Sequence, residues 1–309
     1  MEELPPRLLF RREARAQGWS DEELGRLTRR AEWTRLRRGA YLDAPAPRDD
    51  VARHRLLVRA TIDELRRPAV VSHQSAAVLW GIPLWGLRLD RVHVTRRPGA
   101  STGASRSLHV HVARLPDDDI AVVGGLVVTS PVRTVLDVVR SAPLDVGVVA
   151  LDAALRTGAV DAAAVRAGLS AMVGTRGSRN AARVVALADA RSESVGESRS
   201  RVLLHRLGLP PSDLQFEVRS PEGALIARTD FGWEPQRVVG EFDGRIKYGR
   251  LLRPGQQPGD VVFQEKRRED LVRDEGWAVV RWTWDDLLHP ARLGERVGRA
   301  HDRSRRRSG

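Results

Sequence analysis

Hydrophobic and polar residues alternate in several short runs in the last third of the chain. Alternation with a period of two predicts β-strands, and apolar spacing of three to four residues predicts helices between them. The resulting order is helix, three strands, helix, strand and helix. These elements are predicted at Glu197–Leu207, Leu214–Arg219, Leu225–Phe231, Arg237–Asp243, Val262–Glu275, Ala278–Thr283 and from Trp284 onward.

The first 48 residues have a different pattern. Leu8 to Phe10 are predicted to open an amphipathic helix that ends near Gly18. Ser20 and Glu23 then form a capping-box pattern at the start of a second helix. A strand, a glycine turn and a second strand follow within Trp33–Tyr41. This order is typical of a small winged helix-turn-helix, and a two-helix cap with a solvated basic edge is the alternative.

The basic residues of that hairpin are the predicted DNA contacts of the first segment, because they would lie on its wing. They are Arg35, Arg37 and Arg38.

Residues 49–190 are predicted to form an α/β module without a catalytic cluster. Histidines are its most notable polar residues. His73 stands at a helix start, where a cap or a core hydrogen bond is the simpler interpretation. His109 and His111 share one face of a strand. A structural metal needs three or four ligands, and the sequence shows no third one nearby, so we expect no metal site here.

The domain boundaries follow from these patterns. We predict a multi-domain α/β protein with a winged helix at 1–48, an α/β domain at 49–190, a further α/β domain with the helix, three-strand, helix and strand order at 191–302 and a basic tail at 303–309. The chain has 309 residues, 41% of them hydrophobic, which is enough for several cores. No apolar run approaches the roughly 18 residues of a membrane span. We expect a cytoplasmic protein without a membrane partner.

Charge and composition limit the classes of partner that the protein is expected to bind. The net charge of +12 favours a phosphate-bearing partner such as DNA. All but two of the 52 basic residues are arginines, a bias that a GC-rich genome also produces. The absence of cysteine excludes disulfides, thiolate zinc sites and cysteine nucleophiles. An RNA-binding role has less support, because the sequence shows no aromatic stripe for stacking bases.

Carboxylates gather at one end of the predicted sheet. A hairpin centred at position 235.5 would place Asp230 almost opposite Glu241, with Asp243 on the same face. Neighbouring carboxylates repel one another unless a cation lies between them, and Mg²⁺ or Mn²⁺ is the usual solution at sites that act on phosphate. Glu197 on the preceding helix is a further candidate, with an ion pair to Arg201 as the alternative.

Four segments resemble a very-short-patch-repair-like endonuclease domain of the PD-(D/E)XK superfamily. They are Thr229–Phe231, Val239–Gly244, Glu265–Asp270 and Gly276–Trp284. The resemblance covers about the last 115 residues. It implies that Asp230 and Glu241 bind a divalent metal that catalyses phosphodiester hydrolysis, with Glu197 assisting.

The sequence departs from this family at one position. The superfamily has a lysine two residues after the glutamate, and this chain has Asp243 there. Lys247 and Lys266, the only lysines of the chain, are the candidates to replace it. Their alternative role is ordinary surface charge.

The first 190 residues resemble the AbiEi-like antitoxins of abortive-infection systems, through Trp33–Tyr41 and Val71–Ala77. That resemblance implies DNA binding, repression of the protein's own operon and a cognate toxin as partner. Two hypotheses follow. The chain is either a Mg²⁺-dependent DNA endonuclease or a catalytically inactive DNA-binding regulator or antitoxin. The oligomeric state cannot be inferred from the sequence.

Overall fold

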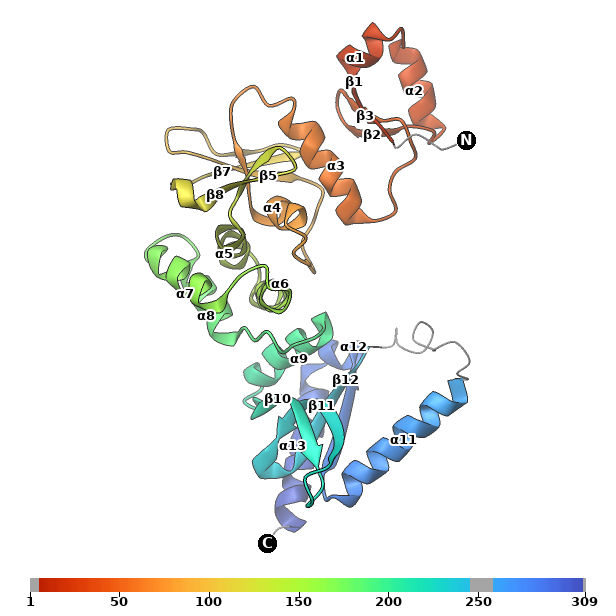
Figure 1. Cartoon of the computed structure of the whole chain (residues 1–309), viewed down its shortest axis with the longest axis vertical. Coiled ribbons are helices and arrows are strands. Elements are labelled where there is room, and N and C mark those ends of the chain that lie inside the picture. Colours follow the sequence, from red (N-terminus) through yellow and green to blue (C-terminus); the bar gives the residue numbers. More distant parts are fainter. Residues whose placement is uncertain (1–5, 245–257, 308–309) are drawn as a thin grey trace. The chain divides into compact units, whose positions relative to one another are not determined.

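The chain is a multi-domain α/β protein, described here by a computed structural model that covers residues 6–244 and 258–307 (Figure 1). Backbone contacts divide it into two units. The N-terminal unit comprises Met1–Ala150 and Thr157–Arg183, and the C-terminal unit comprises Leu151–Arg156 and Val184–Gly309. Each unit contains its own sheet and its own buried apolar residues.

The N-terminal unit begins with a three-stranded antiparallel sheet of order β1-β3-β2 and two helices. Its elements are β1 (Leu8–Phe10), α1 (Arg11–Ala16), α2 (Asp21–Arg29), β2 (Thr34–Arg37) and β3 (Ala40–Leu42). The Ser20–Glu23 capping box is present, as expected. The expectation that Leu8 to Phe10 belong to a helix was wrong. These residues pair with β3, Leu9 opposite Tyr41, and the helix starts only at Arg11.

A six-stranded mixed sheet of order β6-β7-β5-β4-β9-β8 follows in the same unit. Its strands are β4 (Val70–Val71), β5 (Val92–Arg96), β6 (Gly103–Ala104), β7 (Leu108–Val112), β8 (Ile120–Val123) and β9 (Leu126–Thr129). Valines of the central strands form its apolar core together with α3 (Asp50–Ile62) and α4 (His73–Leu79). Burying β-branched side chains on one face leaves the other face of β5 and β7 to polar residues.

Four helices complete this region of the chain: α5 (Pro131–Ser141), α6 (Leu144–Arg156), α7 (Ala162–Ala171) and α8 (Ser178–Leu187). Ser130 caps α5 and Pro131 occupies its first turn, which is a favoured position for proline. Among the described residues, the helices are all too short or too polar to cross a membrane.

From α9 to β13 the C-terminal unit has the element order that the sequence predicts, and the single final helix expected from Trp284 onward is divided into two. The unit consists of α9 (Val195–Arg206), β10 (Asp213–Arg219), β11 (Leu225–Trp233), β12 (Val238–Asp243), α11 (Pro258–Asp274), β13 (Ala278–Thr283), α12 (Trp284–Leu288) and α13 (Pro290–Arg307). The sheet order is β10-β11-β12-β13. The first three strands are antiparallel neighbours, and β13 joins β12 in parallel.

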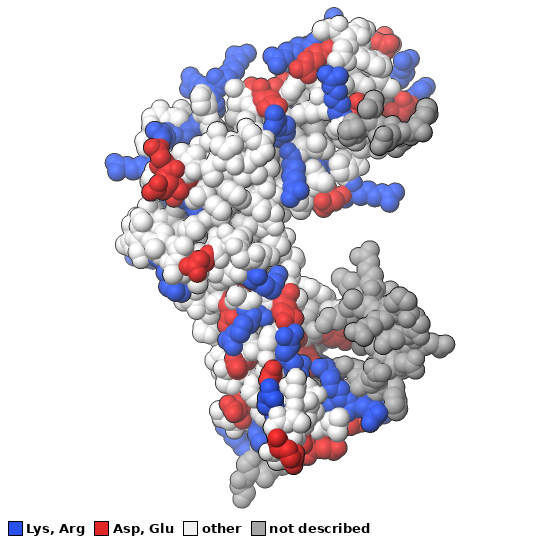
Figure 2. All heavy atoms as spheres, viewed as in Figure 1, with Lys and Arg blue, Asp and Glu red and all other residues white. Residues whose placement is uncertain are grey.

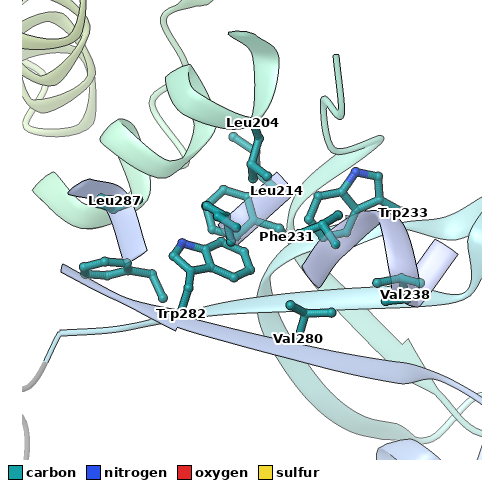
Figure 3. Packing of buried hydrophobic residues seen from close by; sticks show 12 residues of the cluster. Leu204, Leu214, Phe231, Trp233, Val238, Val280, Trp282 and Leu287 are labelled. Carbon is teal, nitrogen blue, oxygen red and sulfur yellow. The ribbon is translucent and has the colours of Figure 1, made fainter. Parts of the chain in front are cut away.

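Apolar residues cover both faces of this sheet. On one face, Phe231, Trp233 and Trp282 pack with leucines of α9, α12 and α13 (Figure 3). On the other face, Val239 packs with Val272 of α11. The sheet therefore lies between two helical layers.

The basic end of the chain differs from its expected form. Arg303 to Arg307, predicted as a tail beyond the last helix, continue α13. The helix is anchored by Leu293, Val297 and Ala300, which are buried in the core. Because helix formation is cooperative, an anchored segment extends into flanking residues with good helix propensity, arginine among them.

Candidate functional site

Asp230 and Glu241 lie on adjacent antiparallel strands in the register that the hairpin predicts. The pairs Phe231 opposite Gly240 and Gly232 opposite Val239 fix that register. The backbone N–H of Phe242 donates to Asp230 Oδ2 at 2.7 Å. The Asp230 carboxylate therefore reaches across to β12 beside Glu241, at the end of the hairpin that faces α11.

Glu241 is bound by two arginines that the sequence analysis did not assign to the site. Arg268 Nη2 on α11 lies 2.6 Å from Glu241 Oε1, and Arg281 Nη2 on β13 lies 2.9 Å from Glu241 Oε2. The Glu241 side chain is only 16% exposed. Two guanidinium groups beside a shielded carboxylate offset its desolvation. Arg281 reaches Glu241 because the parallel pairing of β12 with β13 places the two residues directly opposite each other.

The other predicted members of the site are arranged differently. Asp243 ends β12 opposite Thr283 and is half-buried. Lys266 lies on α11 and is exposed. Lys247 lies outside the described residues. Among the residues described, the cations in contact with Glu241 are thus arginines, not the lysine that the family pattern would supply.

The Glu197 carboxylate accepts several hydrogen bonds at the start of α9. Its Oε2 accepts from the Glu193 N–H at 2.7 Å and from Gln215 Nε2 at 2.9 Å, and Ser194 Oγ donates to its Oε1 at 2.7 Å. The residue is buried. The predicted alternative, an ion pair between Glu197 and Arg201, does not form, because Arg201 binds Asp152 instead. Glu197 thus stabilises the first turn of α9 and its contact with β10.

The end of β12 is fixed by close packing around Phe242. A Cβ atom on Gly196 of α9 would lie 1.9 Å from the Phe242 ring. The Trp284 ring packs edge-on against Phe242, with centroids 5.0 Å apart. Only glycine permits this approach of helix and strand. The position of Glu241, which is next to Phe242, therefore depends on the close contact between Gly196 and the Phe242 ring.

The donor chemistry at Asp230 and Glu241 fits a hard divalent cation. Both groups offer carboxylate oxygens, the ligands that Mg²⁺ and Mn²⁺ prefer. A carboxylate oxygen can accept more than one contact. A cation would nevertheless compete with Arg268 and Arg281 for the Glu241 charge. Its affinity therefore depends on how far the two guanidinium groups move away from Glu241.

The three arginines of the N-terminal hairpin are not equivalent. Arg35 and Arg38 are exposed. Arg37 turns toward α3, where its Nη1 lies 3.6 Å from Glu64 Oε2 and 3.4 Å from the Ala60 carbonyl oxygen. Only Arg35 and Arg38 of this set therefore present their charge to solvent.

Surface charges of both signs are interspersed on the face of the molecule drawn in Figure 2. Many arginines are paired with acids, for example Arg11 and Arg15 with Asp21. Part of the positive charge of the described residues is thus balanced within ion pairs. Selective phosphate contact then depends on individual unpaired arginines more than on one basic surface.

The histidines of the N-terminal unit were assigned separate, minor roles, and the structure brings them together. His73, His93 and His111 have ligand atoms that all lie within 4.8 Å of one another. The expectation that no third ligand is near His111 was wrong, because His93 comes from β5, the strand paired with β7. His109 lies beside this group and stacks on His111 with ring centroids 4.2 Å apart.

Comparison with known proteins leaves the activity open. No protein-family model matches the chain. Two uncharacterized proteins, MT2308 and Rv2248 from two strains of Mycobacterium tuberculosis, are each 29% identical to it over 184 residues, or 59% of this chain. The chain spans 65% of the length of each of these relatives. The solved structure of RV2827C protein from M. tuberculosis aligns over 70% of this chain and 84% of its own, with 12% identity and a TM-score of 0.38.

Proposed function

We propose that this chain is a DNA-binding protein whose C-terminal unit is a divalent-metal-dependent endonuclease. The observation that carries the proposal is the pairing of Asp230 and Glu241 across the β11–β12 hairpin. The helix, three strands, helix and strand around this pair follow the order of the PD-(D/E)XK core that the sequence resembles. Fold likeness alone does not establish activity, so the proposal rests on the carboxylate pair.

Asp230 and Glu241 would hold Mg²⁺ or Mn²⁺ in this function. Such an ion, when bound, lowers the pKa of water and stabilises charge that develops on a phosphodiester. Arg268 and Arg281 contribute positive charge beside Glu241, where the family has a lysine. Guanidinium groups bind phosphate oxygens in a bidentate manner, which suits them to orient a DNA backbone at this edge.

DNA recognition is assigned to the N-terminal hairpin. A helix, a capped second helix and the β2–β3 hairpin support a winged helix-turn-helix at the start of the chain. Arg35 and Arg38 are the exposed cations of its wing. Contacts of this kind position a protein on DNA without reading its sequence.

The second candidate function is a catalytically inactive DNA-binding regulator, or an antitoxin with a cognate toxin. One observation favours it: both oxygens of Glu241 are already bound by guanidinium groups. Arginines that satisfy the carboxylate permanently would keep the nuclease-like fold without a metal. The distinction between the two functions is therefore whether Asp230 and Glu241 act together on a bound cation.

The test is cleavage of supercoiled plasmid by the purified full chain with Mg²⁺ or Mn²⁺. Asp230→Asn and Glu241→Gln remove the carboxylate charges with little change of shape. Asp285→Asn, at an exposed acid of α12, is the matched control. We expect nicking by the wild type and the control and none by the two site variants. DNA retention without nicking by any of the proteins would support the regulator instead.

A further inference from the structure

Three elements of the N-terminal unit converge on one group of histidines. The parallel pair β5–β7 places His93 opposite His109 and Thr95 opposite His111. Alternation then directs these four side chains to one face of the sheet. His73 begins α4 with a φ of +52°, in the left-handed region that residues other than glycine rarely adopt. Conformations of this kind cluster at functional sites, where the surrounding structure holds a side chain in place.

The imidazole rings of His73, His93 and His111 form one close group. His93 Nδ1 lies 3.0 Å from His111 Nε2. The His73 ring stacks on the His111 ring, with centroids 3.7 Å apart and planes within 15°. One ligand atom from each of His73, His93 and His111 lies within 4.8 Å of the other two. The three nitrogens are therefore near enough to bind one ion once the stacked rings of His73 and His111 tilt apart.

The far sides of two rings are held by hydrogen-bond partners of the kind that orient metal ligands. His73 Nδ1 contacts Ser72 Oγ at 3.0 Å, and Thr95 Oγ1 donates to the same hydroxyl at 2.8 Å. His73 Nε2 is thereby left for the cluster. The Gln74 side-chain N–H donates to His93 Nε2 at 2.8 Å, so in this arrangement His93 Nδ1 carries the proton and donates it to His111 Nε2. An ion at His93 Nδ1 would require the Gln74 amide to turn its oxygen toward a protonated Nε2. A partner on the second nitrogen fixes the tautomer and the ring orientation of a ligating histidine.

Two arginines of α5 lie near the cluster, and their charges are partly compensated. Arg133 Nη1 lies 2.8 Å from Asp119 Oδ2, and Arg140 Nη2 lies 2.8 Å from Asp137 Oδ1. Arg133 Nε also lies 3.1 Å from Asp137 Oδ1. The two carboxylates therefore offset part of the positive charge of Arg133 and Arg140.

The geometry points to a transition-metal site formed by His73, His93 and His111, with Zn²⁺ as its expected ion. Three imidazole nitrogens and no carboxylate favour Zn²⁺ and related borderline ions over Mg²⁺ or Mn²⁺. Three histidines leave a fourth tetrahedral position for water or another ligand. The ion would tie α4 to strands β5 and β7. This site is independent of the carboxylates in the C-terminal unit.

The test is Zn²⁺ titration of the full chain after chelator treatment, in competition with a chromogenic chelator. Co²⁺ absorption bands provide a second readout of tetrahedral nitrogen coordination. His93→Gln and His111→Gln each remove one ligand. His111→Cys replaces the ligand with a thiolate that also binds Zn²⁺. His109→Gln, on the same strand and face, and His289→Gln, in the other unit, are the controls. Circular dichroism melting of each metal-free variant establishes that it is folded.

We expect one Zn²⁺ per wild-type chain. His93→Gln and His111→Gln are each expected to weaken Zn²⁺ binding by more than about 100-fold. Removing a hydrogen-bond partner of a metal ligand costs up to about that much, and removing the ligand itself should cost more. His111→Cys and both controls should retain binding. The proposal is overturned if the wild type binds no Zn²⁺, or if folded His93→Gln and His111→Gln bind it as tightly as the wild type. An equal loss in His109→Gln would also contradict the assignment of the three ligands.

Discussion

Arg281 lies directly opposite Glu241 in the parallel pair of β12 and β13, and its Nη2 lies 2.9 Å from Glu241 Oε2. The same nitrogen lies 3.2 Å from Glu269 Oε2 on α11. One guanidinium thus joins two carboxylates from different elements. In this arrangement Arg281 both stabilises the edge of the sheet and competes with any cation for Glu241.

Arg281→Gln is therefore expected to have two opposite effects. Without metal, the loss of charge-assisted hydrogen bonds should lower the free energy of unfolding by about 1–2 kcal/mol. Mn²⁺ should bind more tightly, because a competing cation has been removed. Urea denaturation and Mn²⁺ titration measure the two effects. Arg299→Gln, from an exposed pair with Glu295, is the control and should change stability by less than about 0.5 kcal/mol. Weaker Mn²⁺ binding in Arg281→Gln would mean that Arg281 supports the metal site.

The hairpin arginines should separate into DNA-binding residues and a structural residue. Arg35→Ala and Arg38→Ala are each expected to weaken DNA binding. Each should also reduce the slope of log K against log salt by about 0.9 for every phosphate that the protein no longer neutralises. Arg37→Ala should leave the slope unchanged and lower stability by about 1 kcal/mol, because Arg37 binds Glu64 and the Ala60 carbonyl. Fluorescence anisotropy over a range of salt concentrations measures the slope. Equal effects of all three variants on the slope would contradict the assignment.

Gly196 and Gly298 offer a matched pair of helix glycines. Gly196→Ala places a methyl group 1.9 Å from the Phe242 ring. Forced overpacking of this kind is expected to destabilise the protein by about 1–3 kcal/mol. A Cβ atom at Gly298 of α13 would meet no other atom within 4 Å. Gly298→Ala should therefore stabilise the chain by up to about 1 kcal/mol through helix propensity. Urea denaturation measures the free energy of unfolding of both variants. No change in Gly196→Ala would show that the end of β12 moves easily to accommodate the methyl group.

His301 makes the stability of the C-terminal unit sensitive to acid. Burial, and secondarily the positive charge of Arg305, hold the pKa of His301 below its ordinary value of 6.5. Its ring packs edge-on against Trp233. The folded state resists protonation of His301. The contribution of neutral His301 to the free energy of unfolding is therefore complete above pH 6.5. It is lost as the pH falls below that value, where the unfolded chain takes up a proton first.

The corresponding variant is His301→Phe, which keeps a ring against Trp233 and removes the titration. We expect its free energy of unfolding to fall less between pH 7.5 and pH 5 than that of the wild type. Urea denaturation at several pH values measures the difference, and His289→Phe, at an exposed histidine, is the control. If the free energy of unfolding of the wild type and of His301→Phe depends on pH in the same way, His301 is not the source of the acid sensitivity.

The sequence was sufficient to predict local features of this fold. Alternating polarity and a short turn fixed the register of β11 and β12, because only a few residues separate the two strands. The Ser20 cap was equally local. Leu8 to Phe10 were misassigned because three successive apolar residues carry no clear period, and pairing with β3 decided their conformation.

Contacts between distant segments could not be predicted in the same way. Arg268 and Arg281 reach Glu241 only because α11 and β13 return to β12 after an intervening stretch of chain. His93 and His111 meet because β5 and β7 pair in parallel, and nothing in the spacing of the histidines indicates that pairing. Both the candidate carboxylate site and the histidine cluster thus depend on tertiary pairing more than on a sequence motif.

The most direct test of the central claim is Mn²⁺ binding by the full chain, measured by electron paramagnetic resonance for the wild type, Asp230→Asn and Glu241→Gln. Asp285→Asn is the control. If Asp230 and Glu241 form one metal site, the wild type and the control bind one Mn²⁺ that both site variants lose. Equal Mn²⁺ binding by all four proteins, or none by the wild type, would contradict the account and leave Glu241 as a purely structural partner of Arg268 and Arg281.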